Sequence, residues 1–93
     1  MRLKDKTALI TGGGRGIGLA TALLMLSEGA KVGIVELNEA HAQKGMETAR
    51  SKGYALKAFM GDVSKKDQVV AFTEACVKEF GRIDILVNNA GIA

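Results

Sequence analysis

A dense cluster of glycines near the start of the chain is the feature whose residue types could do chemistry. Five of the seven positions between 12 and 18 are glycine, in the segment Thr11-Gly12-Gly13-Gly14-Arg15-Gly16-Ile17-Gly18. Glycine lets a backbone turn sharply and approach a ligand closely. Where such a loop runs into a helix, free N–H groups at the positive end of the helix dipole bind phosphate. The cluster therefore predicts a phosphate-binding loop; the alternative is a glycine-rich turn that binds nothing.

The spacing of these glycines distinguishes between kinds of phosphate loop. Gly13 and Gly18 have the spacing of a P-loop, but Leu19 follows where that loop requires lysine. The pattern G-x-G-x-x-G fails in every register, because its third glycine would fall on Ile17, Leu19 or Thr21. The pattern that fits is T-G-x-x-x-G-x-G, beginning at Thr11.

The elements that must position this loop alternate between short apolar runs and helical stretches. The sequence predicts strands at 7–10, 31–35, 55–60 and 83–87, and helices at 17–28, at about 38–52 and between Ser64 and Gly81. Asn38 is the expected N-cap of the second helix, and Ser64 with Asp67 the expected capping box of the third. The first helix is expected to present a wide apolar face made of Ile17, Ala20, Leu23, Leu24, Met25 and Leu26.

This alternation predicts an α/β fold. Strands joined through helices of this length pair in parallel, with right-handed crossovers. A doubly wound nucleotide-binding domain of the Rossmann type usually has six strands in the order 3-2-1-4-5-6. We therefore expect residues 1–93 to form the N-terminal part of a dinucleotide-binding domain: an incomplete Rossmann-type parallel sheet, β-α-β-α-β-α-β, with strand order 3-2-1-4 and helices on both faces.

Composition narrows the function classes. The 93 residues are 47% apolar and 25% charged, which suits one small globular domain. No apolar run reaches the ~18 residues of a membrane span, and the N-terminus does not resemble a signal peptide, so a cytoplasmic protein without membrane contact is expected. One cysteine and one histidine exclude an internal disulfide and a cysteine-based zinc site. The net charge of +3 is interspersed and aromatic residues are few, which argues against nucleic-acid binding.

His41 and Cys76 have side chains that could take part in catalysis or metal binding, but we interpret both as structural residues. His41 is expected to be exposed on the second helix, because no partner cluster lies near it in sequence. Cys76 lies among the apolar positions of the third helix and is expected to be a small core residue.

Three motifs together resemble the short-chain dehydrogenase/reductase family. They are the glycine loop, Gly61-Asp62-Val63-Ser64 after the third strand and Asn88-Asn89-Ala90-Gly91 after the fourth. Asn88 resembles a residue that braces the central strands. Asp62 and Val63 would meet the adenine of a dinucleotide, and Asn89, Ala90 and Gly91 would line its adenosine side. The resemblance places the pyrophosphate and the adenosine ribose among Gly12, Gly14, Arg15, Gly16, Ile17 and Gly18.

The end of the second strand bears on the choice between NAD and NADP. Glu36, with Leu37 beside it, lies eighteen residues beyond Gly18, near where an acidic residue binds the ribose 2′-OH of NAD. A carboxylate there would repel a 2′-phosphate. Arg15 argues the other way, because a basic residue in the loop can pair with that phosphate. We weight Glu36 more heavily and expect NAD rather than NADP.

The resemblance implies hydride transfer between a nicotinamide and a small alcohol or carbonyl substrate, in a parent enzyme that is a homo-oligomer. The family's catalytic Ser and Tyr-x-x-x-Lys pair lie downstream of the N-N-A-G motif. The one tyrosine, Tyr54, has Ala58 four residues later, so no catalytic residue is assigned and the 93-residue chain alone is expected to be inactive. The alternative is a non-catalytic nucleotide-binding or interaction module.

Overall fold

The computed structural model describes residues 2–90, and three helices alternate with four strands in them. None of these helices combines the length and the apolar character needed to cross a bilayer. The elements in chain order are β1 (Thr7–Thr11), α1 (Gly16–Ser27), β2 (Lys31–Glu36), α2 (Glu39–Ser51), β3 (Leu56–Met60), α3 (Lys66–Phe80) and β4 (Ile85–Asn88).

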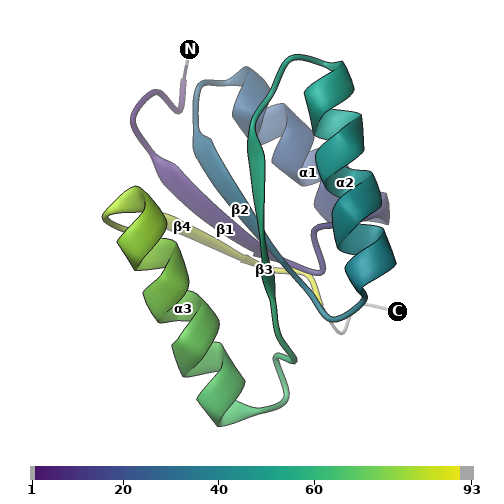
Figure 1. Cartoon of the computed structure of the whole chain (residues 1–93). Helices are drawn as coiled ribbons and strands as arrows, with labels where there is room; N and C mark the ends of the chain where they lie inside the picture. The colour runs from purple at the N-terminus through teal and green to yellow at the C-terminus, as the bar shows by residue number, and fades with distance from the viewer. Residues whose placement is uncertain (1, 91–93) are drawn as a thin grey trace.

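The strands form one parallel sheet in the order β3-β2-β1-β4, which confirms the predicted order. The register of β1 places Ala8 beside Val32 of β2 on one side and beside Ile85 of β4 on the other. Helices α1 and α2 cover one face of the sheet and α3 covers the opposite face, as Figure 1 shows. The doubly wound α/β arrangement expected from the sequence is therefore present.

Alternation along the strands divides the core into two clusters, because successive side chains of a strand point to opposite faces. Ala8 and Ile10 of β1 pack towards α1 and α2, whereas Leu9 between them packs towards α3. On the α3 face, Leu9 meets Phe72 and Cys76, so the expected core position of the cysteine is confirmed.

The buried face of α1 matches the predicted one in part, because Leu26 is buried and Leu23 and Met25 pack against the core. Ile17 and Leu24 are 72% and 63% exposed, and Ala20 is exposed too. The residues that α1 buries fully are Gly18, Ala22 and Leu26. The helix is apolar on nearly every side, so its periodicity does not select a face. Small residues decide instead, because they let the helix backbone approach the sheet.

Asn38 and Gly81 lie at helix ends, as the sequence predicts. Asn38 caps α2 by accepting a hydrogen bond from the N–H of His41 at 3.0 Å, and Gly81 ends α3 with φ of 89°. The predicted capping box at Ser64 is wrong. The Ser64 hydroxyl donates to Asp62 at 2.7 Å instead, and Lys65 occupies the N-cap position without a side-chain hydrogen bond.

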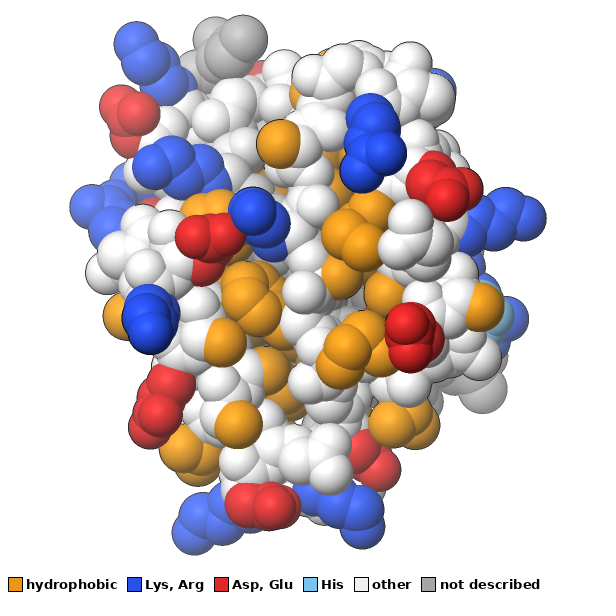
Figure 2. Space-filling model, viewed as in Figure 1, with side chains coloured by type: hydrophobic (Ala, Val, Ile, Leu, Met, Phe, Trp, Pro, Cys, Tyr) orange, Lys and Arg blue, Asp and Glu red, His pale blue; other side chains and the backbone are white. Residues whose placement is uncertain are grey.

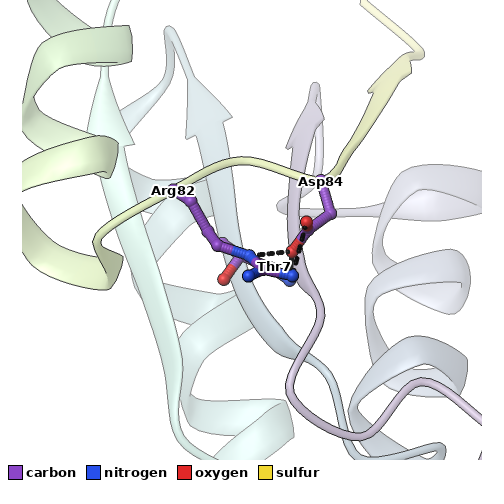
Figure 3. Close-up of polar contacts among 3 residues, drawn as sticks. All are labelled: Thr7, Arg82 and Asp84. Carbon is purple, nitrogen blue, oxygen red and sulfur yellow. Dashed lines mark hydrogen bonds and ion pairs between the residues drawn. The ribbon is translucent and has the colours of Figure 1, made fainter.

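Asp84 joins the beginnings of β1 and β4, as Figure 3 shows. Its Oδ2 accepts a hydrogen bond from the Thr7 N–H at 2.8 Å, and its own N–H donates to the Thr7 carbonyl at 2.9 Å. Arg82 holds the same carboxylate through Nε at 2.9 Å and Nη2 at 2.8 Å. The Arg82 hydrogen bond, followed by that from Thr7, lowers the pKa of Asp84 below its ordinary value. The predicted fourth strand began at Ile83 and included Asp84, but the structure starts β4 at Ile85, two residues later.

Within the described residues β3 and β4 are the two edge strands of the sheet, and β4 pairs with β1 alone. Leu86 of β4 is 64% exposed, and a cavity of about 240 Å³ lies between it, Phe72 of α3 and Leu9 of β1. On the face of the molecule drawn in Figure 2, hydrophobic side chains gather towards the middle, and positive and negative side chains are mixed around the rim.

Candidate functional site

The carboxyl ends of β1, β2 and β4 meet at one edge of the sheet and enclose a cavity of about 740 Å³. The chain winds from β1 to β2 on one side and places β4 on the other side, so this is the switch point of the sheet. Open α/β sheets bind ligands at such a point. The cavity is lined by Gly12, Arg15, Gly16, Ile17, Glu36, Leu37, Asn38, His41, Asn89 and Ala90.

The glycine loop turns from β1 into α1 through two left-handed residues. Gly12 has φ of 64° and Gly16 has φ of 56°, a region that side chains with a Cβ rarely adopt. Arg15 precedes the helix in an extended conformation and makes no capping hydrogen bond with its side chain. The N–H groups of the first turn of α1 are therefore available to an anion at this end of the helix.

Other glycines of the loop are needed because neighbouring groups approach them closely. A Cβ on Gly18 would collide with the carbonyl oxygen of Gly12, and one on Gly13 would collide with the side chain of Ile34. A Cβ on Gly14 would lie 2.6 Å from the carbonyl oxygen of His41. These contacts fix the path of the loop against β2, α1 and α2.

Thr11 connects the glycine loop to the segment after β4. Its side-chain oxygen accepts hydrogen bonds from the N–H groups of Asn89 at 3.0 Å and Ala90 at 3.1 Å, and it lies 3.3 Å from Asn88 Oδ1. Asn89 completes the link, because its Nδ2 donates to the carbonyl of Gly12 at 3.1 Å. The two motifs predicted from the sequence are therefore one hydrogen-bonded unit.

Glu36 ends β2 with a carboxylate that faces the glycine loop. The residue is 7% exposed, and its Oε2 accepts a hydrogen bond from the N–H of Gly14 at 2.8 Å. A carboxylate accepts up to about four hydrogen bonds, so this contact leaves capacity for ligand hydroxyls in the cavity that Glu36 also lines. Leu37 beside it is 70% exposed at the mouth of the cavity.

Asp62 and Val63 do not line this cavity. Asp62 Oδ1 accepts hydrogen bonds from the N–H of Ser64 at 2.9 Å and from its hydroxyl at 2.7 Å. These bonds, that of the hydroxyl first, lower the pKa of Asp62. Val63 lines the smaller cavity on the α3 face of the sheet. Of the other predicted site residues, Gly14 and Gly18 are buried behind the cavity wall, and Gly91 lies outside the described residues.

Three residues that the sequence did not mark as site residues shape this region. Asn38 and His41 line the cavity, and His41 is half-buried, whereas the sequence led us to expect an exposed side chain. Gly45 lies inside α2, where a Cβ would come within 3.0 Å of the Gly14 carbonyl oxygen. A glycine in a helix interior lowers stability by about 1 kcal/mol relative to alanine. Its presence inside a predicted helix was therefore the feature of the sequence that could have indicated a close backbone contact.

The groups around the cavity suit a ligand with phosphates and hydroxyls. Backbone N–H groups and the Arg15 guanidinium offer positive charge, and the Glu36 carboxylate offers an acceptor for hydroxyl groups. Within residues 2–90, no cluster of histidine, cysteine and acidic side chains could hold a metal ion.

The chain is similar to known proteins over nearly its whole length. A family model described as short chain dehydrogenase matches residues 6–93. Galactitol 2-dehydrogenase of Agrobacterium fabrum is 49% identical over 92 residues, which are 99% of this chain and 35% of that protein. 2-(S)-hydroxypropyl-CoM dehydrogenase 3 of Xanthobacter autotrophicus is 41% identical over 92 residues, which are 99% of this chain and 36% of that protein.

A solved structure of NAD+-bound xylitol dehydrogenase superimposes with a TM-score of 0.92 at 35% identity, over 98% of this chain and 35% of that one. The chain therefore spans about a third of the length of the proteins that it matches.

Proposed function

Because the chain belongs to the short-chain dehydrogenase family, we propose that residues 1–93 are the N-terminal, cofactor-binding part of a nicotinamide-dependent oxidoreductase. The observation that carries this proposal is the cavity at the switch point of the sheet, which joins the glycine loop, Glu36 and the segment Asn89–Ala90. Each of these three parts comes from a different strand end, and each matches one requirement of a dinucleotide: phosphate, ribose or adenosine contact.

The pyrophosphate would lie against the glycine loop. The proposed contacts of the pyrophosphate and the adenosine ribose are Gly12, Gly14, Arg15, Gly16, Ile17 and Gly18. Among them Gly14 and Gly18 act by letting the loop pack closely, since both are buried. On the adenosine side we propose Asn89, Ala90 and Gly91, and for the adenine Asp62 and Val63, which the adenine would reach outside this cavity.

NAD is the proposed cofactor, with NADP less favoured. Glu36 lines the cavity beside the glycine loop. Its charge would repel a 2′-phosphate there, and its oxygens would accept hydrogen bonds from ribose hydroxyls. Leu37 beside it contributes no positive charge. Arg15 is the opposing feature, because it lines the same cavity and its guanidinium could pair with a phosphate.

The nicotinamide, when bound, supplies hydride transfer to or from a small alcohol or carbonyl compound. The relatives support this substrate class, because their names include a galactitol dehydrogenase and a xylitol dehydrogenase. In our proposal the residues described here hold and orient the cofactor, whereas the acid/base residues belong to a longer polypeptide. We further propose that this polypeptide is a cytoplasmic homo-oligomer.

Binding of NADH to the longer polypeptide tests the proposal, with two glycine variants as a matched pair. Gly16 and Gly53 both have positive φ, 56° and 84°, and a Cβ at either would meet no atom within 4 Å, but only Gly16 lines the cavity. Alanine at either position introduces comparable backbone strain, of order 1 kcal/mol. We expect Gly16→Ala to weaken NADH binding about tenfold or more and Gly53→Ala to leave it unchanged. Equal dissociation constants for the two variants would refute the proposed site.

An activity assay and the sequence of the rest of the gene distinguish the proposed enzyme from the alternative, a non-catalytic module. Purified 93-residue chain, incubated with NAD or NADP and a panel of secondary alcohols, is expected to produce no NADH or NADPH. A Ser and a Tyr-x-x-x-Lys pair encoded beyond residue 93 support the enzyme. A full-length gene product that binds NADH but contains no such residues supports the non-catalytic module.

A further inference from the structure

We propose that Glu36 is a positioning residue that latches the glycine loop in its anion-binding shape, in addition to facing the ribose. The inference rests on the proposed function, because it concerns the same cavity. It adds a specific claim: the hydrogen bond that the Glu36 side chain accepts from Gly14 orders the loop and so improves the binding of a negatively charged ligand, although the charge of Glu36 opposes that binding.

The middle of the loop is enclosed on the side of β2 and α2. Gly14 donates its N–H to Glu36 Oε2 at 2.8 Å, in a buried contact. A Cβ on Gly14 would lie 2.9 Å from Cγ of Glu36, so the glycine lies directly against the glutamate side chain. On α2, Gly45 allows an approach so close that its own Cβ would come within 3.0 Å of the Gly14 carbonyl oxygen.

The other half of the loop is open. Arg15 and Gly16 are exposed, and a Cβ on Gly16 would meet no atom within 4 Å. The shape of this open half therefore depends on how firmly Gly14 is held. Within residues 2–90, the hydrogen bond to Glu36 is the side-chain contact that fixes the Gly14 N–H.

A role through charge and a role through hydrogen bonding predict opposite changes in anion affinity when the Glu36 side chain is removed. If Glu36 acted by charge alone, its loss would strengthen the binding of any anion in the cavity. If Glu36 latches the loop, its loss leaves the buried Gly14 N–H without an acceptor, and the loop relaxes away from its anion-binding shape. The sign of the change in affinity therefore separates the two roles.

Inorganic pyrophosphate is the probe, because it has no ribose and reports on the loop alone. We would measure its dissociation constant by calorimetry in the longer polypeptide, and amide hydrogen exchange at Gly14 in the same samples. Glu36→Ala is expected to weaken pyrophosphate binding about tenfold and to speed exchange at Gly14. Glu36→Gln keeps an acceptor without the charge and is expected to bind pyrophosphate at least as well as the parent.

Two further variants keep the test decisive. Glu39→Ala removes an exposed carboxylate from the first turn of α2, and is expected to leave Gly14 exchange unchanged. Glu36→Asp keeps the charge but shortens the side chain, so it is expected to speed exchange even if Glu36→Ala fails to fold. Tighter pyrophosphate binding by Glu36→Ala, or unchanged exchange at Gly14 in both Glu36→Ala and Glu36→Asp, would overturn the latch. A parent that binds neither pyrophosphate nor NADH would instead refute the proposed function, while the exchange data would still decide the latch.

Discussion

The side-chain oxygen of Thr11 accepts a hydrogen bond from the N–H of Asn89 at 3.0 Å, although 78 residues separate the two along the chain. The contact ties the end of β1 to the residue that follows β4. Because Asn89 in turn binds the carbonyl of Gly12 at 3.1 Å, a change at Thr11 reaches the glycine loop.

We expect Thr11→Val to destabilise the protein and to weaken NADH binding. Valine has nearly the same shape, but it leaves the N–H groups of Asn89 and Ala90 without their acceptor in a partly buried region. The expected loss in free energy of unfolding is about 2 kcal/mol. Urea denaturation and NADH titration would measure both effects. Thr11→Ser keeps the hydroxyl and is the control, with an expected loss of about 1 kcal/mol from the missing methyl group.

We expect the double variant Glu36→Gln, Leu37→Arg to favour NADP over NAD. It removes the repulsion of a 2′-phosphate and adds a guanidinium at an exposed position on the mouth of the cavity. The ratio of the NADH and NADPH dissociation constants should shift by about tenfold or more. Leu37→Gln is the control for the loss of leucine. A parent that already binds NADPH more tightly would mean that Arg15 dominates and that our interpretation of Glu36 is wrong.

The carboxylate of Asp84 makes stability depend on pH. Its pKa is lowered in the folded state by Arg82 first and Thr7 second, so the ionised form stabilises the fold at neutral pH. This contribution is complete above the unfolded pKa of about 3.9 and is lost as the pH falls through the lower folded pKa. We therefore expect Asp84→Asn to be less stable than the parent at pH 7, with a difference that shrinks below about pH 4. Urea midpoints from pH 7 to pH 2.5 would test this, and a pH-independent difference would contradict it.

The unpaired edge of β4 should lower the stability of the isolated 93-residue chain and promote its self-association. A domain of this size buries only ~60–65% of its chain surface even when it is complete, and unpaired groups on an edge strand promote association. We expect a weakly stable monomer or a chain that self-associates through β4, with weak NAD binding at best. Light scattering and thermal melts with and without NAD would show which.

A charged side chain at an exposed position of β4 should reduce this self-association. Leu86 is 64% exposed on β4, so Leu86→Lys is expected to shift the chain towards monomer. Val70→Lys on α3, at a position 48% exposed, is the control and should have little effect. A parent chain that melts sharply as a clean monomer would show that these residues are self-sufficient and would favour the non-catalytic module.

The strand order and the place of the glycine loop could be predicted from the sequence, because both depend on local patterns. Apolar runs and helical stretches alternate along the chain, and the handedness of crossovers leaves few ways to arrange them. The end of α2 was predictable for the same reason, since Lys52 is followed by Gly53 with its positive φ of 84°.

Contacts between distant segments could not be predicted in this way. The periodicity of α1 did not select its buried face, because the helix is apolar nearly all round, and the close approach at Gly18 and Ala22 is visible only in three dimensions. Ser64 has the spacing of a cap, but Asp62 competes for its hydroxyl. The bond from Gly14 to Glu36 spans 22 residues and has no counterpart in any local pattern.

The solitary thiol of this chain gives it an internal reporter of motion. Cys76 is fully buried between α3 and the sheet, and burial raises the pKa of its thiol. Alkylating reagents attack the thiolate, so Cys76 is protected both by enclosure and by protonation while α3 remains docked. The rate at which such a reagent labels the isolated chain therefore measures how often α3 separates from the sheet, without any added probe.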